Sequence, residues 1–567
     1  MTSGAVDPTV RWGSSVVVDL LRQAGVRHVA LNPGASFRGI HDSLAHEPDA
    51  PELILCLHES IAVGVAHGYA KAAGAPMGVL LHNVVGLQNA AMSIYNAWRD
   101  RAPMLLLGGT GPKSARSRRP WIDWIHTASV QGDLVRDFVV WDNEPHDLHS
   151  VPDSFVRGWR AATSAPGGPV YLCYDVDLQE DHVPDDFIEP DISGFDVPAP
   201  PAPTGETVCR IAELLRAAER PVLLAGFVGE TDEGFRALAA LAEATGAAVI
   251  DTGVRHAFPT GHELCATGVP GILDAADAIV LLDIDDVPAA VTTTSARMIN
   301  VTLSGARLRA WAQDYQLLVR GETVAASADA VVGAVLNQLR ARPIDAERVA
   351  ARIARVSQAV TAARSAWRAS AAWSTADGVV PLDRLLYEVG EAVKDDRYVL
   401  ANGTNQRAEH RTWNLDQPRQ YLGWHSGGGL GYGVPATIGA SIALGPDVIA
   451  VDIQADGDLL FLPSALWTAV RYRTAALIVV NNNRQYGNTV EHAMKIGVAR
   501  GRSDASRYAA SAIDDPAVGL SALAASFGVW ASGPITDPTA LQEQLDAALR
   551  VVRSGRPALL DVLTPGF

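Results

Sequence analysis

Residues 453–487 read "IQADGDLLFLPSALWTAVRYRTAALIVVNNNRQYG", and this stretch decides the fold of the chain. It contains an Asp-Gly turn, a helix-like segment, an apolar strand and a row of three asparagines, residues 481–483. After Gly457 come 24 residues (458–481), followed by Asn482 and Asn483. That length fits one βαβ unit, and ligands bind α/β proteins at the carboxyl ends of such parallel strands.

The composition indicates a globular protein with several domains. A length of 567 residues suggests about three domains, because single cores stop growing well below that size. Hydrophobic residues make up 48% of the chain and charged residues 19%, as in ordinary soluble domains. The net charge of −17 argues against nucleic acid or an anionic membrane as the partner.

The cysteines and the chain start give further expectations. The four cysteines, Cys56, Cys173, Cys209 and Cys265, are too far apart for a CxxC redox motif or a zinc ribbon. The start, "MTSGAVDPTVRWG", has no basic and apolar signal pattern, and no apolar run is long enough to span a membrane. We therefore expect a cytoplasmic protein.

Strand and helix signals alternate in three regions. We expect domains at 1–188, 207–342 and 382–567, with a proline-rich linker at 189–206 and a helical connector at 343–381. Strands of about six apolar residues are separated by helical patterns throughout, which predicts three doubly wound α/β domains with mostly parallel sheets. The predicted strands lie in these stretches: "VRHVALNPG", "LILCL", "PMGVLLHN", "APMLLLGGTG", "GPVYLCYDV", "RPVLLAGFVG", "AAVIDTG", "DAIVLLDID", "ARMINVTL", "DRYVLANGTN", "DVIAVDIQA", "AALIVVNNN" and "RPALLDVL".

The Asp-Gly turn and the asparagines carry the chemistry of a metal and phosphate site. Asp456 and Asn483 follow neighbouring parallel strands, so a carboxylate and an amide oxygen are expected to converge. Hard oxygen ligands of this kind suit Mg²⁺, which completes its coordination shell with waters and phosphate oxygens. Gly457 and Gly487 would let backbone N–H groups approach those phosphates.

This unit resembles the GDG…NN signature of the thiamine-diphosphate-dependent enzymes. The resemblance implies that Asp456, Asn483 and the backbone carbonyl of Gln485 hold Mg²⁺ against the diphosphate. Two residues depart from the signature. Ala455 replaces its first Gly and is expected to restrict a turn that needs a positive φ. Asp458 replaces a small residue, and a second carboxylate beside a diphosphate is unfavourable unless it points away.

The resemblance also implies the residues of the other half of a cofactor site. Such enzymes need a carboxylic acid against the pyrimidine ring, and Glu59 follows a strand and opens a helix in "LILCLHESIAVGVAHGYAKA". In "GGGLGYGVP", the Gly428 carbonyl and Leu430 match the pyrimidine acceptor and the residue under the thiazolium ring. Thr404 and Asn405 of "ANGTN" are candidate diphosphate contacts. In the family the site lies between two subunits, so a homodimer or homotetramer is implied.

Within this superfamily of benzoylformate and pyruvate decarboxylases and acetolactate synthases, the chain most resembles benzoylformate decarboxylase. "LNPGAS" and "LLHNVVGLQNAAMSIYNAWRDRAPMLLL" carry that resemblance, which makes His82 a candidate proton-relay residue. The substrate-binding Ser of that enzyme aligns with Ala35, and Ser36 follows it. Its second catalytic His has no counterpart in "LLDIDDVPAAVTTTS", so His425 and Trp424 are candidates for catalytic and substrate roles.

The segment after the asparagines, residues 487–516, is longer than the resemblance predicts. We expect a helix followed by a mobile lid, with Glu491 as a candidate substrate residue. Its arginines, Arg500, Arg502 and Arg507, suit an anionic substrate or one that carries coenzyme A, although solvated arginines are common on surfaces.

The expected reaction is cleavage or formation of a C–C bond next to a carbonyl, with thiamine diphosphate and Mg²⁺. Decarboxylation of a 2-oxo acid to an aldehyde comes first, with carboligation as a further outcome. The alternatives are a 2-hydroxyacyl-CoA or acyloin lyase or synthase and a non-catalytic cofactor-binding paralogue. "LLAGFVGE" lacks the full GxGxxG pattern of a dinucleotide enzyme, although ADP or FAD in the middle domain stays open.

Overall fold

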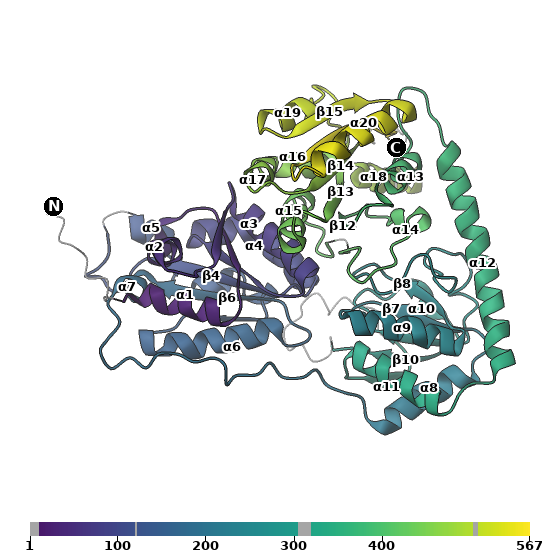
Figure 1. Cartoon of the computed structure of the whole chain (residues 1–567), viewed down its shortest axis with the longest axis horizontal. Helices are drawn as coiled ribbons and strands as arrows, with labels where there is room; N and C mark the ends of the chain where they lie inside the picture. Colours follow the sequence, from purple (N-terminus) through teal and green to yellow (C-terminus); the bar gives the residue numbers. More distant parts are fainter. Residues whose placement is uncertain (1–10, 120–121, 304–318, 424, 503–508, 567) are drawn as a thin grey trace. The chain divides into compact units, whose positions relative to one another are not determined.

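Three parallel β-sheets, each flanked by helices, organise the chain (Figure 1). The computed structural model describes residues 11–119, 122–303, 319–423, 425–502 and 509–566. Every strand pair in these sheets is parallel, so consecutive strands are joined by crossover connections. The prediction of three α/β domains with parallel sheets is confirmed.

The first sheet has the strand order β2-β1-β3-β4-β6-β5. Its strands are β1 (His28–Leu31), β2 (Glu52–Leu55), β3 (Met77–Leu81), β4 (Met104–Thr110), β5 (Trp141–Asn143) and β6 (Pro169–Asp175). The α-helices among them are α1 (Gly13–Gln23), α2 (Arg38–His46), α3 (Glu59–Ala73), α4 (Val84–Arg99), α5 (Ile122–His126), α6 (Val151–Thr163) and α7 (Val176–Glu180). Short 3₁₀ turns are η1 (Ala35–Phe37), η2 (Gln131–Leu134), η3 (Arg136–Phe138) and η4 (Leu148–Ser150).

The second sheet has the order β11-β10-β9-β7-β8. Its strands are β7 (Pro221–Ala225), β8 (Ala248–Asp251), β9 (Ala278–Leu282), β10 (Arg297–Val301) and β11 (Glu322–Val324). Its helices are α8 (Gly205–Ala217), α9 (Asp232–Thr245), α10 (Ala289–Thr293) and α11 (Ala328–Ala341). Residues 189–204 contain no helix or strand, as a linker requires, whereas α8 already begins inside the predicted linker range.

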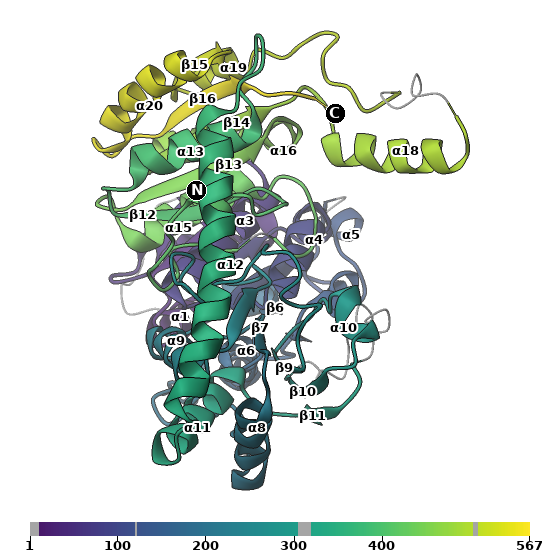
Figure 2. The same ribbon diagram turned by 90° about the vertical axis from the view of Figure 1, so that its right-hand side faces the viewer.

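The helix α12 (Ala346–Trp373) leads to the third sheet, as Figure 2 shows, and lies within the predicted connector. This sheet has the order β12-β13-β14-β16-β15. Its strands are β12 (Tyr398–Asn402), β13 (Ile449–Ala455), β14 (Ala476–Asn482), β15 (Trp530–Ile535) and β16 (Ala558–Leu563). Its helices are α13 (Leu382–Val393), α14 (Glu409–Thr412), α15 (Gly433–Leu444), α16 (Asp456–Phe461), α17 (Ala465–Arg471), α18 (Gly487–Ala499), α19 (Leu520–Ser526) and α20 (Pro538–Val552).

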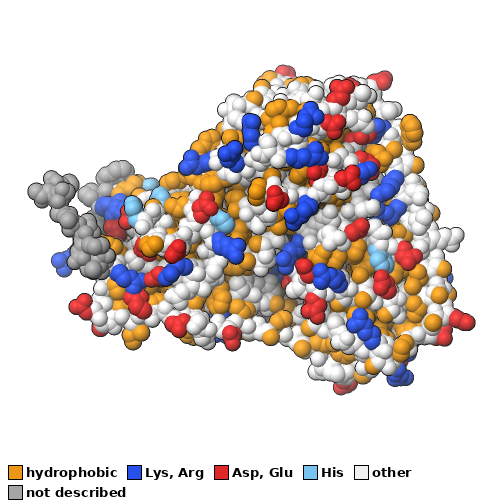
Figure 3. All heavy atoms as spheres, in the orientation of Figure 1, with side chains coloured by type: hydrophobic (Ala, Val, Ile, Leu, Met, Phe, Trp, Pro, Cys, Tyr) orange, Lys and Arg blue, Asp and Glu red, His pale blue; other side chains and the backbone are white. Residues whose placement is uncertain are grey.

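The chain divides into two compact units, which are described separately below. The first unit contains residues 1–199 and 425–439, and the second contains 200–424 and 440–567. Among the described residues, no helix is long and apolar enough to cross a membrane. On the face drawn in Figure 3, acidic and basic side chains are interspersed rather than gathered by sign.

The apolar pattern does not predict three strands, β5, β11 and β15, and each of them lies at an edge of its sheet. The first two have only 3 residues each, and most of the residues in β15 are half-buried. An edge strand needs less apolar sequence because one side of it is not paired, so its local signal is weak.

Within the first unit, glycines let α3 approach the part of α15 that belongs to this unit, residues 433–439, at backbone distance. A methyl group at Gly68 would overlap the backbone of Ala436, and one at Gly439 would overlap the carbonyl oxygen of Val65. This contact joins the helix that begins at Glu59 to the helix that follows the Gly-rich segment. It therefore depends on residues that have no side chain.

Gly68→Ala should lower the thermal unfolding midpoint, because overpacking against a backbone costs about 1–3 kcal/mol. The matched control is Gly333→Ala in α11, where a methyl group would meet open space. That variant should be neutral or raise the midpoint, because Ala is favoured over Gly in a helix by about 0.5–1 kcal/mol. Equal midpoints for the two variants in differential scanning fluorimetry would contradict the proposed close contact.

Candidate functional site

The Asp-Gly turn starts a helix directly at the end of a buried strand in the second unit. Ala455 ends β13 and has φ −81°, so it needs no positive φ, and the expected restriction by this Ala is wrong. Asp456 opens α16 and is 3% exposed. Burial raises the pKa of Asp456 to about 6, although the backbone N–H groups of Gly457, Arg484 and Gln485 favour its ionised form.

The three asparagines have different roles. Asn481 accepts a hydrogen bond from the Thr564 hydroxyl (2.6 Å), and Asn482 donates to Asp561 (2.8 Å), so both hold β14 to the neighbouring strand β16 and the residue that follows it. Asn483 lies beyond the strand and accepts the backbone N–H of Gln485 (3.2 Å). The Asn482 side-chain oxygen also accepts the Arg484 N–H (3.2 Å), so both asparagines contact the loop whose N–H groups reach Asp456, and Asn483 is the one that lies beyond the strand.

The loop between Asn483 and α18 brings these groups together. Residues Ala455 and Asn481 pair in the register of β13 and β14, so the two strands end side by side. Arg484 follows with φ +54°, a left-handed conformation that costs a non-glycine residue of order 1 kcal/mol. The Gln485 N–H then reaches both Asp456 and Asn483, while its carbonyl accepts the Gly487 N–H at 3.0 Å. A carboxylate and an amide oxygen thus converge, as the sequence predicts.

The second acid of the turn, Asp458, is held back against the strand. It is 7% exposed and accepts a hydrogen bond from the Gln454 side chain (2.6 Å). Gln454 lies on β13, so the carboxylate of Asp458 is tied to the sheet. This contact explains how the chain tolerates an acid at a position where the resemblance predicts a small residue.

The "ANGTN" loop follows β12 and is braced by a buried acid. Glu409, which is 0% exposed, accepts the backbone N–H (2.6 Å) and the hydroxyl (3.2 Å) of Thr404. Thr404 is half-buried, and Asn405 is exposed. The loop is therefore ordered by α14 while Asn405 remains available to a ligand.

In the first unit, Glu59 opens α3 and is only 3% exposed. The Asn89 side chain of α4 donates to its carboxylate at 3.1 Å. A methyl group at Gly86 would lie 3.1 Å from Glu59 Oε1 and 3.0 Å from His82 Cβ, so the acid and the histidine flank one glycine. The structure thus brings together two of the residues predicted as catalytic, and Gly86 gives both of them room.

His82 is held by Ser36 and faces a second histidine. Ser36 Oγ lies 2.9 Å from His82 Nδ1 and accepts the Asn83 backbone N–H at 3.0 Å. The rings of His82 and His126 are 5.5 Å apart and nearly perpendicular. Burial lowers the pKa of His82, His126 and Arg119 lower it further, and Glu59 opposes them.

His126 is a candidate that sequence reasoning misses. It lies in "WIDWIHTASVQ", a stretch without a motif, and it reaches His82 only because α5 follows β4 at the same end of the sheet. Ser36 has a clearer role than in the prediction, since it positions His82. Ala35, the aligned position for a substrate-binding Ser, is exposed on η1.

The Gly-rich segment of the first unit, residues 425–433, packs against α4. Asn96, buried in α4, donates to the Gly429 carbonyl at 2.9 Å and accepts the Gly429 N–H at 3.0 Å. Gly428 has φ +72°, and the side chain of Leu430 is left 39% exposed. This loop therefore presents an apolar side chain from a fixed backbone, and the role of Leu430 towards a cofactor stays a prediction.

His425 begins the same segment and lies in a buried polar cluster. Asp100 accepts from Lys71 (2.7 Å) and the Ser426 N–H (2.8 Å) and pairs with His67 (2.9 Å). Burial lowers the pKa of His425 to about 3, so its ring is neutral at neutral pH. Its ring packs on Tyr432 at 4.8 Å. Its catalytic role stays a prediction.

The remaining predicted residues are less engaged. Glu491 forms an ion pair with Lys495 (2.6 Å) on α18. Most side chains of α18 are exposed, and Figure 2 shows this helix projecting away from the other helices of the third sheet. Arg500 and Arg502 are exposed beyond that helix. Trp424 and Arg507 lie outside the described residues, and the predicted lid remains untested.

The residues present fit thiamine diphosphate with a divalent cation. The donor set of Asp456 and Asn483 offers hard oxygen atoms, and the buried Nε2 of Gln485 has no hydrogen-bond partner among the described residues. Gly457 lies against the Tyr486 ring, where a methyl group would be 2.8 Å from a ring carbon. The turn is thus compact enough for backbone N–H groups to approach a phosphate.

Comparison with known proteins agrees with this geometry. Residues 11–133 match the family described as thiamine pyrophosphate enzyme, N-terminal TPP binding domain, and residues 401–562 match the corresponding C-terminal TPP binding domain. Benzoylformate decarboxylase of Pseudomonas aeruginosa is 26% identical over 97% of this chain and 98% of its own. The mitochondrial acetolactate synthase catalytic subunit of Aspergillus candidus is 24% identical over 97% of this chain and 80% of its own.

Solved structures share the fold over nearly the whole chain. The 4-hydroxybenzoylformate decarboxylase of Rhodococcus jostii RHA1 has a TM-score of 0.79 at 22% identity and covers 98% of this chain and 100% of its own. The benzoylformate decarboxylase of Polynucleobacter necessarius has a TM-score of 0.76 at 18% identity, with 98% and 99% covered. With both cofactor-binding domains matched, the chain belongs to the thiamine-diphosphate-dependent enzymes.

Proposed function

We propose that this enzyme decarboxylates a 2-oxo acid with an aromatic side chain, of the benzoylformate type, to an aldehyde. The observation that carries the proposal is His82, fixed by Ser36 beside Glu59 and facing His126. Relatives named for benzoylformate and 4-hydroxybenzoylformate support the substrate class. We further propose a cytoplasmic homodimer or homotetramer with sites between subunits.

Each half of the site has a proposed role. Asp456, Asn483 and the Gln485 carbonyl hold Mg²⁺, while Thr404 and Asn405 contact the diphosphate. Thiamine diphosphate, when bound, supplies the nucleophilic carbon and the electron sink for cleavage next to a carbonyl.

In the first unit, Glu59 presents its carboxyl to the pyrimidine ring, and Asn89 keeps that carboxyl oriented. The Gly428 carbonyl and the Leu430 side chain shape the cofactor. His82, neutral at neutral pH because of burial, exchanges a proton with the substrate oxygen or carbon.

Carboligation to a 2-hydroxyketone is the second candidate, because acetolactate synthases are also among the relatives. For a 2-hydroxyacyl-CoA substrate, Arg500 and Arg502 are the candidate contacts within the described part of the chain, and both are exposed. A non-catalytic paralogue is disfavoured because Glu59, Asp456 and Asn483 are all retained and oriented.

The metal assignment predicts a conditional stabilisation. Thiamine diphosphate should raise the thermal midpoint of the metal-free protein only with Mg²⁺ present, because a ligand of the folded state stabilises it by mass action. Asp456→Ala should remove that shift. The control is Asp447→Ala, an exposed acid before the other end of β13, which should keep it. An undiminished shift in Asp456→Ala would refute the metal site.

The role of Glu59 predicts slow activation of the bound cofactor. Glu59→Gln should bind thiamine diphosphate but exchange its C2 proton more slowly, by roughly 10²–10⁴-fold, as for loss of a positioned proton-transfer group. The control is Glu52→Gln, which changes an exposed acid of β2 and should leave the exchange rate unaltered. NMR-monitored H/D exchange at the wild-type rate in Glu59→Gln would exclude this role.

The histidine pair predicts a pH effect. Because burial and His126 lower the pKa of His82, the acid limb of kcat/KM should lie below pH 6.5. His126→Ala removes a neighbouring charge and should move that limb towards neutral pH, and His82→Ala should lower kcat by about 10²-fold or more. The control is His46→Ala, because His46 is exposed on α2 and its loss should leave the acid limb in place. If the limb does not move in His126→Ala, the two histidines are uncoupled.

A further inference from the structure

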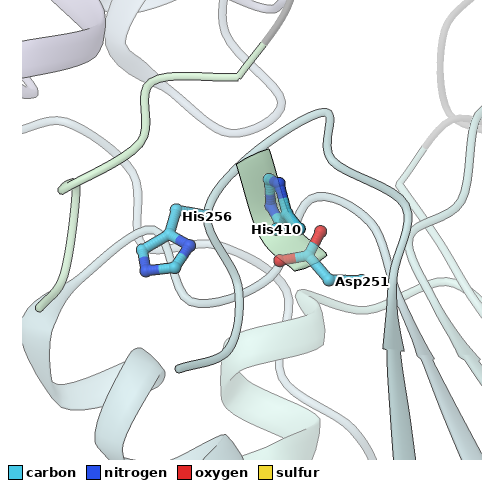
Figure 4. Close-up of side chains that lie close together, drawn as sticks. All are labelled: Asp251, His256 and His410. Carbon is cyan, nitrogen blue, oxygen red and sulfur yellow. The ribbon is translucent and has the colours of Figure 1, made fainter. Parts of the chain in front are cut away.

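Three buried side chains of the second unit, none of them a predicted cofactor residue, lie close together. Asp251 ends β8, His256 lies in the loop that follows, and His410 comes from α14. One ligand atom from each lies within 4.8 Å of the other two. Figure 4 shows the Asp251 carboxylate against the His410 ring, with His256 on the other side of the cluster.

The hydrogen bonds of the cluster are incomplete. The Asp251 carboxylate accepts the backbone N–H groups of Gly253 (2.6 Å) and Ala257 (2.9 Å). Both ring nitrogens of His256 and of His410 lack a hydrogen-bond partner within the described ranges. The backbone of Leu415 approaches the His256 ring, but without hydrogen-bond geometry. Four buried ring nitrogens without partners are unusual, because buried polar groups are normally satisfied.

The protonation states leave lone pairs free to bind a cation. Burial lowers the pKa of His256 to about 4 and that of His410 well below its usual range, so both rings are neutral at neutral pH. Asp251 has remaining acceptor capacity, since a carboxylate offers about four lone-pair directions. Burial raises its pKa to about 6, which still leaves it mostly ionised at neutral pH.

Two arginines limit which cation fits. Arg407 donates to the Asp251 backbone carbonyl at 3.3 Å, and Arg364 donates to those of Thr260 (2.6 Å) and His410 (3.2 Å). Their positive charges oppose a cation held by electrostatics alone. Mg²⁺ and Ca²⁺ prefer all-oxygen ligands, whereas Zn²⁺ and its neighbours bind imidazole nitrogen strongly. The two-nitrogen, one-oxygen donor set therefore selects a transition metal.

We propose that Asp251, His256 and His410 bind a divalent transition metal of the zinc type, with water as a fourth ligand. Metal–nitrogen bonds of about 2.0–2.1 Å would draw the three side chains closer than they lie here. The ion would fasten α14 to the loop after β8. Since Glu409 of α14 braces Thr404, the metal would also steady the loop proposed to contact the diphosphate.

The test uses untagged full-length protein in saturating Mg²⁺, treated with a chelator and then titrated with Zn²⁺ or Co²⁺. One equivalent of zinc per chain should be retained after gel filtration, measured by elemental analysis. Co²⁺ should give the visible d–d absorption of a nitrogen-coordinated, low-symmetry site. Asp456→Ala should keep both signals, which separates this site from the proposed Mg²⁺ site.

His256→Ala and His410→Ala should each weaken zinc binding by more than the 10–100-fold typical of lost outer-shell contacts. The matched control is His262→Ala, in the same loop but paired with Glu243 at 3.2 Å, which should bind like the wild type. If either variant fails to fold, His410→Gln and the wild-type Co²⁺ spectrum decide. No stoichiometric metal in the wild type, or undiminished binding in both histidine variants, would overturn the proposal and assign the cluster to ordered water.

Discussion

Parallel strand pairing is the constraint on which the rest of the structure depends. Because all strands of a sheet run the same way, each must return through a crossover, and the polar residues after the strands collect at one edge. This is why Asp456 and Asn483, separated by a helix in the sequence, both contact the Gln485 N–H. The same rule places Ser36, His82 and His126 at one end of the first sheet.

A second constraint acts within the first unit, where charged groups are buried together. Lys71 and Asp100 are 3% and 1% exposed and lie 2.7 Å apart. Although burial opposes ionisation, Lys71 and His67 hold the pKa of Asp100 well below its usual range. The other carboxylate oxygen accepts the Ser426 N–H, so the pair also holds the start of the Gly-rich segment. Loss of one partner would leave a buried charge, which is strongly destabilising.

Much of the fold can be predicted from the sequence because central parallel strands are buried on both faces and read as apolar runs. The row of Ala, Leu, Ile and Val in β14 is typical of a buried strand. Gly74 marks the end of α3, because its φ of +66° is a conformation that favours glycine. The edge strands β5, β11 and β15 could not be predicted, since their short sequences carry little apolar signal.

By itself, the sequence determined three parallel α/β sheets and predicted where a cofactor would bind, because strand burial and the Asp-Gly to Asn-Asn spacing are patterns within short stretches of the chain. Only the tertiary structure decided which groups support that chemistry. Asn89 beside Glu59, His126 beside His82, Gln454 on Asp458 and the Asp251, His256 and His410 cluster all join residues without a shared motif. The physical reason is that side-chain contacts depend on how the helices and strands pack against one another, and this packing produces no repeating pattern of residues in the sequence.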